Sequence, residues 1–146
     1  SLPPVRQYWI PVLNRSEPMA RWRKVNDDLA ELADEMDVMY PSLYTFYENR
    51  ADWKKYAKAN LDEAKQYGKP VYAFLWPQYH DSNPKLKGRY IPRDYWREQL
   101  EFCYEHADGI VIWDYSQDAW DPDAGWWLET LDFLESVRER EARAAE

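Results

Sequence analysis

The chain has 146 residues, a formal net charge of −8, one cysteine, and an aromatic content of 17% that includes nine Trp and 12 Tyr. This length fits one domain that can bury its own core, and the single Cys103 excludes an internal disulfide and a cysteine-based zinc site. The acidic balance disfavours nucleic acid and anionic membrane surfaces as partners, and no apolar run approaches the roughly 20 residues that cross a bilayer.

The sequence also lacks motifs for cofactors and metal ions. It contains four glycines, which are not clustered as in a dinucleotide-binding fingerprint or a P-loop. His80 and Asp81 are adjacent, but no second histidine stands at a metal-binding spacing. We therefore expect no cofactor and no metal ion, and we interpret His80 first as a hydrogen-bonded loop residue.

The first unit of the chain is expected to be a strand followed by a helix. Residues 5–13 form an apolar and aromatic run that predicts a strand, although Pro11 cannot donate a hydrogen bond to a neighbouring strand. Pro18 suits the first turn of a helix. That helix is predicted from apolar residues spaced three or four apart, at Trp22, Val25, Leu29, Leu32 and Met36.

The second unit repeats this order. Residues 38–47 are rich in aromatic side chains and predict a strand that is interrupted at Pro41. An apolar stripe with helical spacing then runs through residues 53–67. Gly68 and Pro70 follow in the order that is typical of the end of a helix.

The third and fourth units complete the series. Residues 71–76 predict a strand, and a helix opened by Pro92 follows a long polar loop. Residues 109–113 show no polar alternation, which is typical of a strand buried on both faces of a parallel sheet. The last helix is expected to start at Pro122.

Four strand–helix units predict an α/β fold with a parallel sheet. Strands that start near residues 5, 38, 71 and 109 give units of 33 to 38 residues. A (β/α)₈ barrel of the TIM type takes about 250 residues, so four units correspond to half of one. An open three-layer sheet of the flavodoxin type is the alternative. The domain is expected to span residues 1–138, with residues 139–146 as a charged helix end or tail.

A half-barrel has two open sheet edges, which natural proteins cover or pair. We therefore expect a homodimer that completes an eight-stranded barrel.

Aromatic and polar side chains gather in the loops that follow the four expected strands. The carboxyl ends of parallel strands meet at one rim, where ligands bind in such folds. Flat rings beside hydroxyl, amide and carboxylate groups suit a sugar, which has an apolar face and a polar edge. The sequence predicts a carbohydrate ligand, with packing of the barrel mouth or of a domain interface as the alternative role of these rings. The candidate binding residues are Tyr44, Tyr47, Trp76, Tyr79, His80, Trp113 and Trp120.

Carboxylates in the same loops are the candidates for catalysis. Glycoside hydrolysis normally needs two carboxyl groups on either side of the scissile bond. Asp114 and Asp118 share one loop, but no Asp-x-Glu pair stands at a strand end. The residues that we select as catalytic candidates are Glu48, Asp81 and Asp114.

Three segments resemble the later strands of hyaluronidase-type glycoside hydrolases. They are residues 40–44 (YPSLY), 79–83 (YHDSN) and 109–113 (GIVIW), and their order and spacing agree with that family over residues 37–115. The resemblance implies a (β/α) barrel in which Tyr44 and Trp113 line the sugar cleft. It gives weaker support for Tyr79 and Asp81 as cleft residues.

The same resemblance implies what the chain does not contain. The family's catalytic acid belongs to an Asp-x-Glu at an earlier strand end, and neither this motif nor the family's disulfide-forming cysteines have a counterpart here. The chain is therefore expected to be the C-terminal half of a barrel that keeps part of the substrate platform. The alternatives are an intact glycosidase that uses Glu48, Asp81 or Asp114, and a non-enzymatic domain whose aromatic rim binds a protein.

Overall fold

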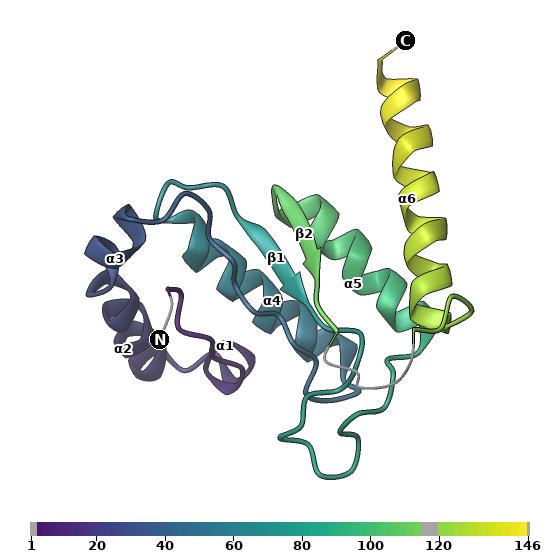
Figure 1. Cartoon of the computed structure of the whole chain (residues 1–146). Coiled ribbons are helices and arrows are strands. Elements are labelled where there is room, and N and C mark those ends of the chain that lie inside the picture. The colour runs from purple at the N-terminus through teal and green to yellow at the C-terminus, as the bar shows by residue number, and fades with distance from the viewer. Residues whose placement is uncertain (1–2, 115–119, 146) are drawn as a thin grey trace.

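The structure is a computed structural model that describes residues 3–114 and 120–145 (Figure 1). Its elements, in chain order, are α1 (Trp9–Leu13), α2 (Ser16–Asp27), α3 (Ala30–Asp34), α4 (Arg50–Lys65), β1 (Tyr72–Leu75), α5 (Arg93–His106), β2 (Gly109–Ile112) and α6 (Gly125–Ala144). No helix within these ranges combines the length and the hydropathy of a membrane span.

A small parallel sheet lies at the centre. β1 and β2 are paired in parallel from Tyr72 opposite Gly109 to Leu75 opposite Ile112. Residues 39–45 run beside β1 on its other side through isolated parallel bridges, among them Ser42 with Phe74. The predicted second strand is thus present as a bridged segment and not as a continuous strand. Pro41 has no N–H, and it contributes only its carbonyl, which accepts a 3.0 Å hydrogen bond from the Phe74 N–H.

The prediction of a strand over residues 5–13 is wrong. Residues 9–13 form α1, a five-residue helix that packs against α4 and ends at Asn14 with φ +47°. Pro11 lies in the first turn of α1, where a backbone N–H would have no partner within the helix. A short apolar run is compatible with a strand or a helix, and periodicity alone does not separate the two. Four complete strand–helix units are therefore not observed in the described residues.

The single helix expected over residues 18–36 is divided into α2 and α3. The carbonyl of Asn26 accepts hydrogen bonds from the Leu29 N–H at 2.9 Å and from the Tyr67 hydroxyl at 2.8 Å, which ends α2. Trp22 is buried, and its indole N–H donates to the Val5 carbonyl at 2.7 Å. Other positions of the predicted stripe, Val25 and Leu32, are exposed.

The core lies between the sheet and the two helices α4 and α5, which Figure 1 shows along the same side of the strands. Trp53, Tyr56 and Leu61 of α4 and Trp96 and Leu100 of α5 are fully buried in it. Cys103 of α5 is buried in the same core, and burial raises the pKa of its thiol. α4 ends where the sequence predicts, with Gly68 at φ +67°.

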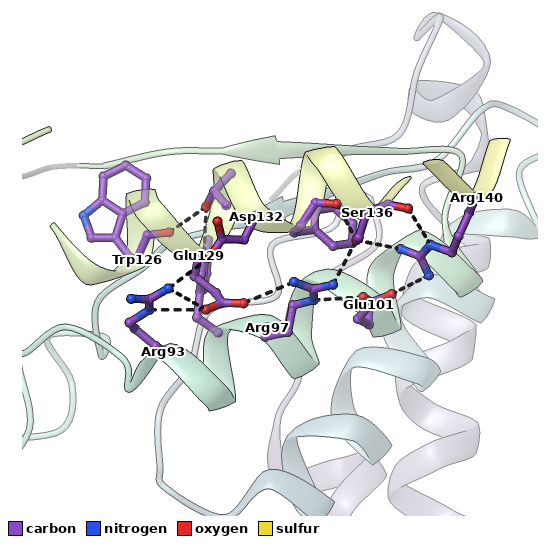
Figure 2. Close-up of polar contacts among 11 residues, drawn as sticks. Arg93, Arg97, Glu101, Trp126, Glu129, Asp132, Ser136 and Arg140 are labelled. Carbon is purple, nitrogen blue, oxygen red and sulfur yellow. Dashed lines mark hydrogen bonds and ion pairs between the residues drawn. The ribbon is translucent and has the colours of Figure 1, made fainter. Parts of the chain in front are cut away.

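α6 packs against α5 through a buried contact flanked by ion pairs (Figure 2). The indole N–H of Trp96 donates to Thr130 Oγ1 at 2.9 Å in the buried part. Toward the surface, Arg97 contacts Glu101 at 2.8 Å and Glu129 at 3.2 Å, and Arg140 contacts Glu101 at 2.9 Å. α6 continues to Ala144, and its last turns project from the molecule in Figure 1.

Candidate functional site

Four of the predicted binding residues come together in one group, the ring cluster, formed by Tyr44, Trp76, His80 and Trp113. The Tyr44 ring lies 6.0 Å from Trp113 at an interplanar angle of 20°, and 5.7 Å from His80 at 27°. Trp76 meets Trp113 at 5.2 Å and 64°. The rings thus combine stacked and edge-to-face contacts, which are the preferred geometries of aromatic pairs.

The ring cluster forms at the carboxyl ends of neighbouring parallel segments. Tyr44 lies one residue before the end of the bridged segment, while Trp76 and Trp113 directly follow β1 and β2. Parallel pairing brings these three ends to one edge of the sheet. Tyr44, His80 and Trp113 keep part of their surface accessible, so the cluster is not a sealed part of the core.

Thr45 holds the loop that carries His80. The Thr45 carbonyl accepts a hydrogen bond from the His80 N–H at 2.8 Å. The buried Thr45 hydroxyl accepts another from Gln99 Nε2 of α5 at 2.9 Å. The first bond ties the loop after β1 to the bridged segment, and the second ties that segment to a core helix, which together fix the backbone position of His80.

The imidazole of His80 is held in its neutral form. Its Nδ1 accepts the Ser82 N–H at 3.1 Å and lies 2.9 Å from Ser82 Oγ, so the ring proton belongs on Nε2. Burial and the nearby Arg6 charge lower the pKa of His80, and Asp81 opposes them. The ring therefore offers a neutral face and a neutral N–H at physiological pH.

Trp76 adds a buried hydrogen-bond donor to the ring cluster. Its side chain is 5% exposed, and its Nε1 has no hydrogen-bond partner among the described residues. A buried donor without an acceptor is unfavourable by about 1–3 kcal/mol. The Nε1 atom itself has almost no accessible surface, so it does not face solvent at the ring cluster.

Arg6 is a component of this region that the sequence analysis missed. Its guanidinium carbon lies 5.2 Å from the centre of the Tyr44 ring and 5.3 Å from that of Phe46. Burial raises the pKa of Tyr44, while a hydrogen bond with Ser42 and the Arg6 charge oppose this shift. No local pattern indicates Arg6, because its partners are distant in the sequence.

The other three predicted binding residues lie elsewhere. Tyr47 contacts Trp9 at a centroid distance of 5.1 Å. Tyr79 is 3% exposed and belongs to the hydrophobic core, and burial raises the pKa of its hydroxyl. Trp120 is 63% exposed and contacts Trp126 and Trp127 at the start of α6.

The catalytic candidates Glu48, Asp81 and Asp114 are all exposed and come from different loops. Glu48 precedes the N-cap of α4, Asp81 lies in the turn after His80, and Asp114 follows Trp113. Asp118 lies outside the described residues. A glycosidase acid is normally a shielded carboxyl group. Within residues 3–114 and 120–145, no group of three or more His, Cys, Asp or Glu side chains is arranged to hold a metal ion.

Comparisons with protein-family models and with curated protein sequences find no match. A comparison with solved structures does find matches. The fold resembles that of bee venom hyaluronidase. The TM-score to its monoclinic crystal structure is 0.59, at 22% sequence identity, over 82% of this chain and 38% of that chain.

A second structure of bee venom hyaluronidase, in complex with a hyaluronic acid tetramer, gives a TM-score of 0.58 at 22% identity. It matches over 82% of this chain and 37% of that chain. The chain thus spans less than two fifths of the hyaluronidase chains that it matches. At this identity the likeness concerns the fold, and it supports the hyaluronidase-like fold indicated by residues 37–115.

Proposed function

We propose that the ring cluster binds carbohydrate. The observation that carries the proposal is the near-parallel pair Tyr44 and Trp113 beside the buried Trp76 indole and the neutral His80. Partly exposed rings can stack on the C–H face of a sugar, and the Nε2–H of the partly exposed His80 ring can donate to one of its hydroxyl oxygens. A few polar groups set among aromatic side chains are typical of small-ligand sites.

The structural neighbour supports the chemical class of the ligand. One bee venom hyaluronidase structure is a complex with a hyaluronic acid tetramer, so a protein of this fold holds a saccharide. In this chain, the ring cluster lies at the carboxyl ends of parallel strands, where ligands bind in α/β folds. We infer that an oligosaccharide is the ligand here as well.

The proposed activity is binding without independent hydrolysis. The sequence contains no Asp-x-Glu motif, and Glu48, Asp81 and Asp114 are exposed side chains from separate loops. Hydrolysis by this chain alone would require two of them to flank one glycosidic bond. A glycosidase using these three carboxylates is the second candidate. Its signature would be hydrolysis that is lost in Glu48→Gln, Asp81→Asn or Asp114→Asn.

We further propose that the chain is the C-terminal half of a barrel and that two copies associate. The bridged segment 39–45 and β2 are the outer members of the described sheet, with β1 between them. Outer strands expose unpaired N–H and C=O groups that favour further pairing. In a two-fold pair, β2 of one copy would lie beside residues 39–45 of the other. With three described sheet members in each copy, the closed sheet would have six strands and not the eight expected from four units.

The binding proposal is tested by calorimetry with hyaluronic acid oligosaccharides and with neutral N-acetylglucosamine oligomers. Trp113→Ala removes one stacking face and is expected to weaken binding by about tenfold or more. Trp120→Ala is the matched control, because Trp120 is an exposed tryptophan outside the ring cluster. Equal affinity in wild type and Trp113→Ala, or no binding by the wild type, would contradict the proposal.

A further inference from the structure

A second group of aromatic rings lies next to the ring cluster and is more exposed. Trp9 of α1 and Tyr47, in the loop before α4, are 51% and 37% exposed. Their ring centres are 5.1 Å apart, and the rings are inclined by 46°. We call this pair the outer platform.

The outer platform rests on a buried ring. Tyr8 is buried and contacts Trp9 at 5.0 Å and Tyr47 at 5.3 Å. Tyr8 is itself packed against Tyr56 of α4 at 5.1 Å. Two exposed rings are therefore supported from below by the core, which limits their loss of conformational freedom on binding a ligand.

Phe46 connects the outer platform to the ring cluster. The centre of the Phe46 ring lies 6.5 Å from that of Tyr47 and 4.8 Å from that of His80. The Arg6 guanidinium covers both Phe46 and Tyr44. An unbroken series of ring contacts thus runs from Trp113 through Tyr44, His80, Phe46 and Tyr47 to Trp9.

We propose that the outer platform is an additional saccharide subsite, which binds the units of an oligosaccharide that extend beyond the ring cluster. This inference rests on the proposed function. Continuity with the ring cluster favours the same ligand chain over an unrelated partner. The inclination of the two rings suits successive sugar units, which are rotated relative to one another along a glycan. The outer platform would therefore set a preference for longer chains.

The inference is tested with a series of hyaluronic acid oligosaccharides of increasing length, titrated by calorimetry. Wild-type affinity is expected to rise with length until the chain reaches the outer platform. Trp9→Leu keeps apolar volume on Tyr8 but removes the aromatic ring. This variant should show no increase in affinity for oligosaccharides long enough to reach the outer platform, and its affinity for the longest one should be about tenfold lower than that of the wild type. The shortest oligosaccharide that binds should keep its affinity. Trp9→Phe should restore most of the rise.

Tyr47→Ala provides a second variant if α1 tolerates no change at Trp9, and Trp120→Ala is the control in each case. Thermal unfolding confirms that each variant is folded. The inference is overturned if Trp9→Leu and Tyr47→Ala bind all lengths like the wild type, or if they weaken all lengths equally. If Trp113→Ala nevertheless lowers the affinity for oligosaccharides of every length, carbohydrate binding by the ring cluster is still supported, although the outer platform is not a subsite. If the wild type binds no oligosaccharide, both proposals fail.

Discussion

His80 links the pH dependence of stability to the ring cluster. Its Nδ1 accepts the Ser82 N–H, and protonation of Nδ1 would remove that bond and place a cation near Arg6. The lowered pKa means that the folded state binds fewer protons at this residue than the unfolded state, whose pKa is close to 6.5. The contribution of neutral His80 to stability is therefore complete above about pH 6.5. It decreases as the pH falls from there toward the folded-state pKa.

We expect the NMR titration of the His80 ring to have its midpoint below pH 6.5. Urea unfolding at pH 7 and pH 5 should show a loss of stability in acid that is smaller in His80→Gln, because glutamine has no proton to gain. A His80 midpoint above 6.5 would contradict the described environment of the ring. An equal loss in both proteins would assign the acid sensitivity to other groups.

The ring cluster shows how far the sequence determines the site. Trp76 and Trp113 end strand-like runs and Tyr44 lies near the end of one, and parallel pairing is enough to predict that such ends meet. Arg6 and Trp9 could not be found in this way, because their positions depend on α1 and on contacts across the chain. Tyr79 was selected with its neighbour His80, but adjacent residues differ in burial, and Tyr79 lies in the core.

Among the helices and strands too, those set by local sequence were predictable and those set by contacts between distant residues were not. α4, α5, β1 and β2 follow from helical periodicity, terminal Gly and Pro signals and continuous apolar runs. α1 could not be distinguished from a strand, because its run is short and Pro11 is compatible with a helix start as well as with a sheet edge. The break between α2 and α3 depends on Tyr67, which donates to the Asn26 carbonyl from 41 residues away.

The α5–α6 interface allows buried and exposed polar contacts to be compared (Figure 2). Thr130→Val removes the acceptor of the buried Trp96 indole N–H, and it is expected to lower the free energy of unfolding by about 1–3 kcal/mol. Arg140→Ala removes a partly exposed ion pair with Glu101, and a loss of about 1 kcal/mol or less is expected.

Urea unfolding of both variants at low and high salt tests this order. Salt should reduce the effect of Arg140→Ala and leave that of Thr130→Val unchanged, because screening acts mainly on exposed charges. If Arg140→Ala lowers the free energy of unfolding at low salt more than Thr130→Val does, the ion pairs, and not the buried contact, dominate the attachment of α6.

At the scale of the molecule, the proposed dimer gives a direct test. Light scattering coupled to size-exclusion chromatography should give twice the mass of the 17.7 kDa chain at micromolar concentration. Val111→Lys introduces a charge into β2, whose residues are partly accessible, and charged side chains discourage pairing at a sheet edge. We expect this variant to shift the population toward the monomer. A wild type that is monomeric at all concentrations would contradict the dimer.

Because Cys103 is buried in the core, the rate at which a thiol reagent labels it measures how often the core opens. It is the only cysteine of the chain, its side chain is buried on α5, and its pKa is raised by burial. A thiol reagent should therefore react only when the packing around α5 opens. The rate of labelling at neutral pH then reports how often this happens. A bound oligosaccharide that stabilises the native state should slow this labelling, and no further cysteine has to be introduced.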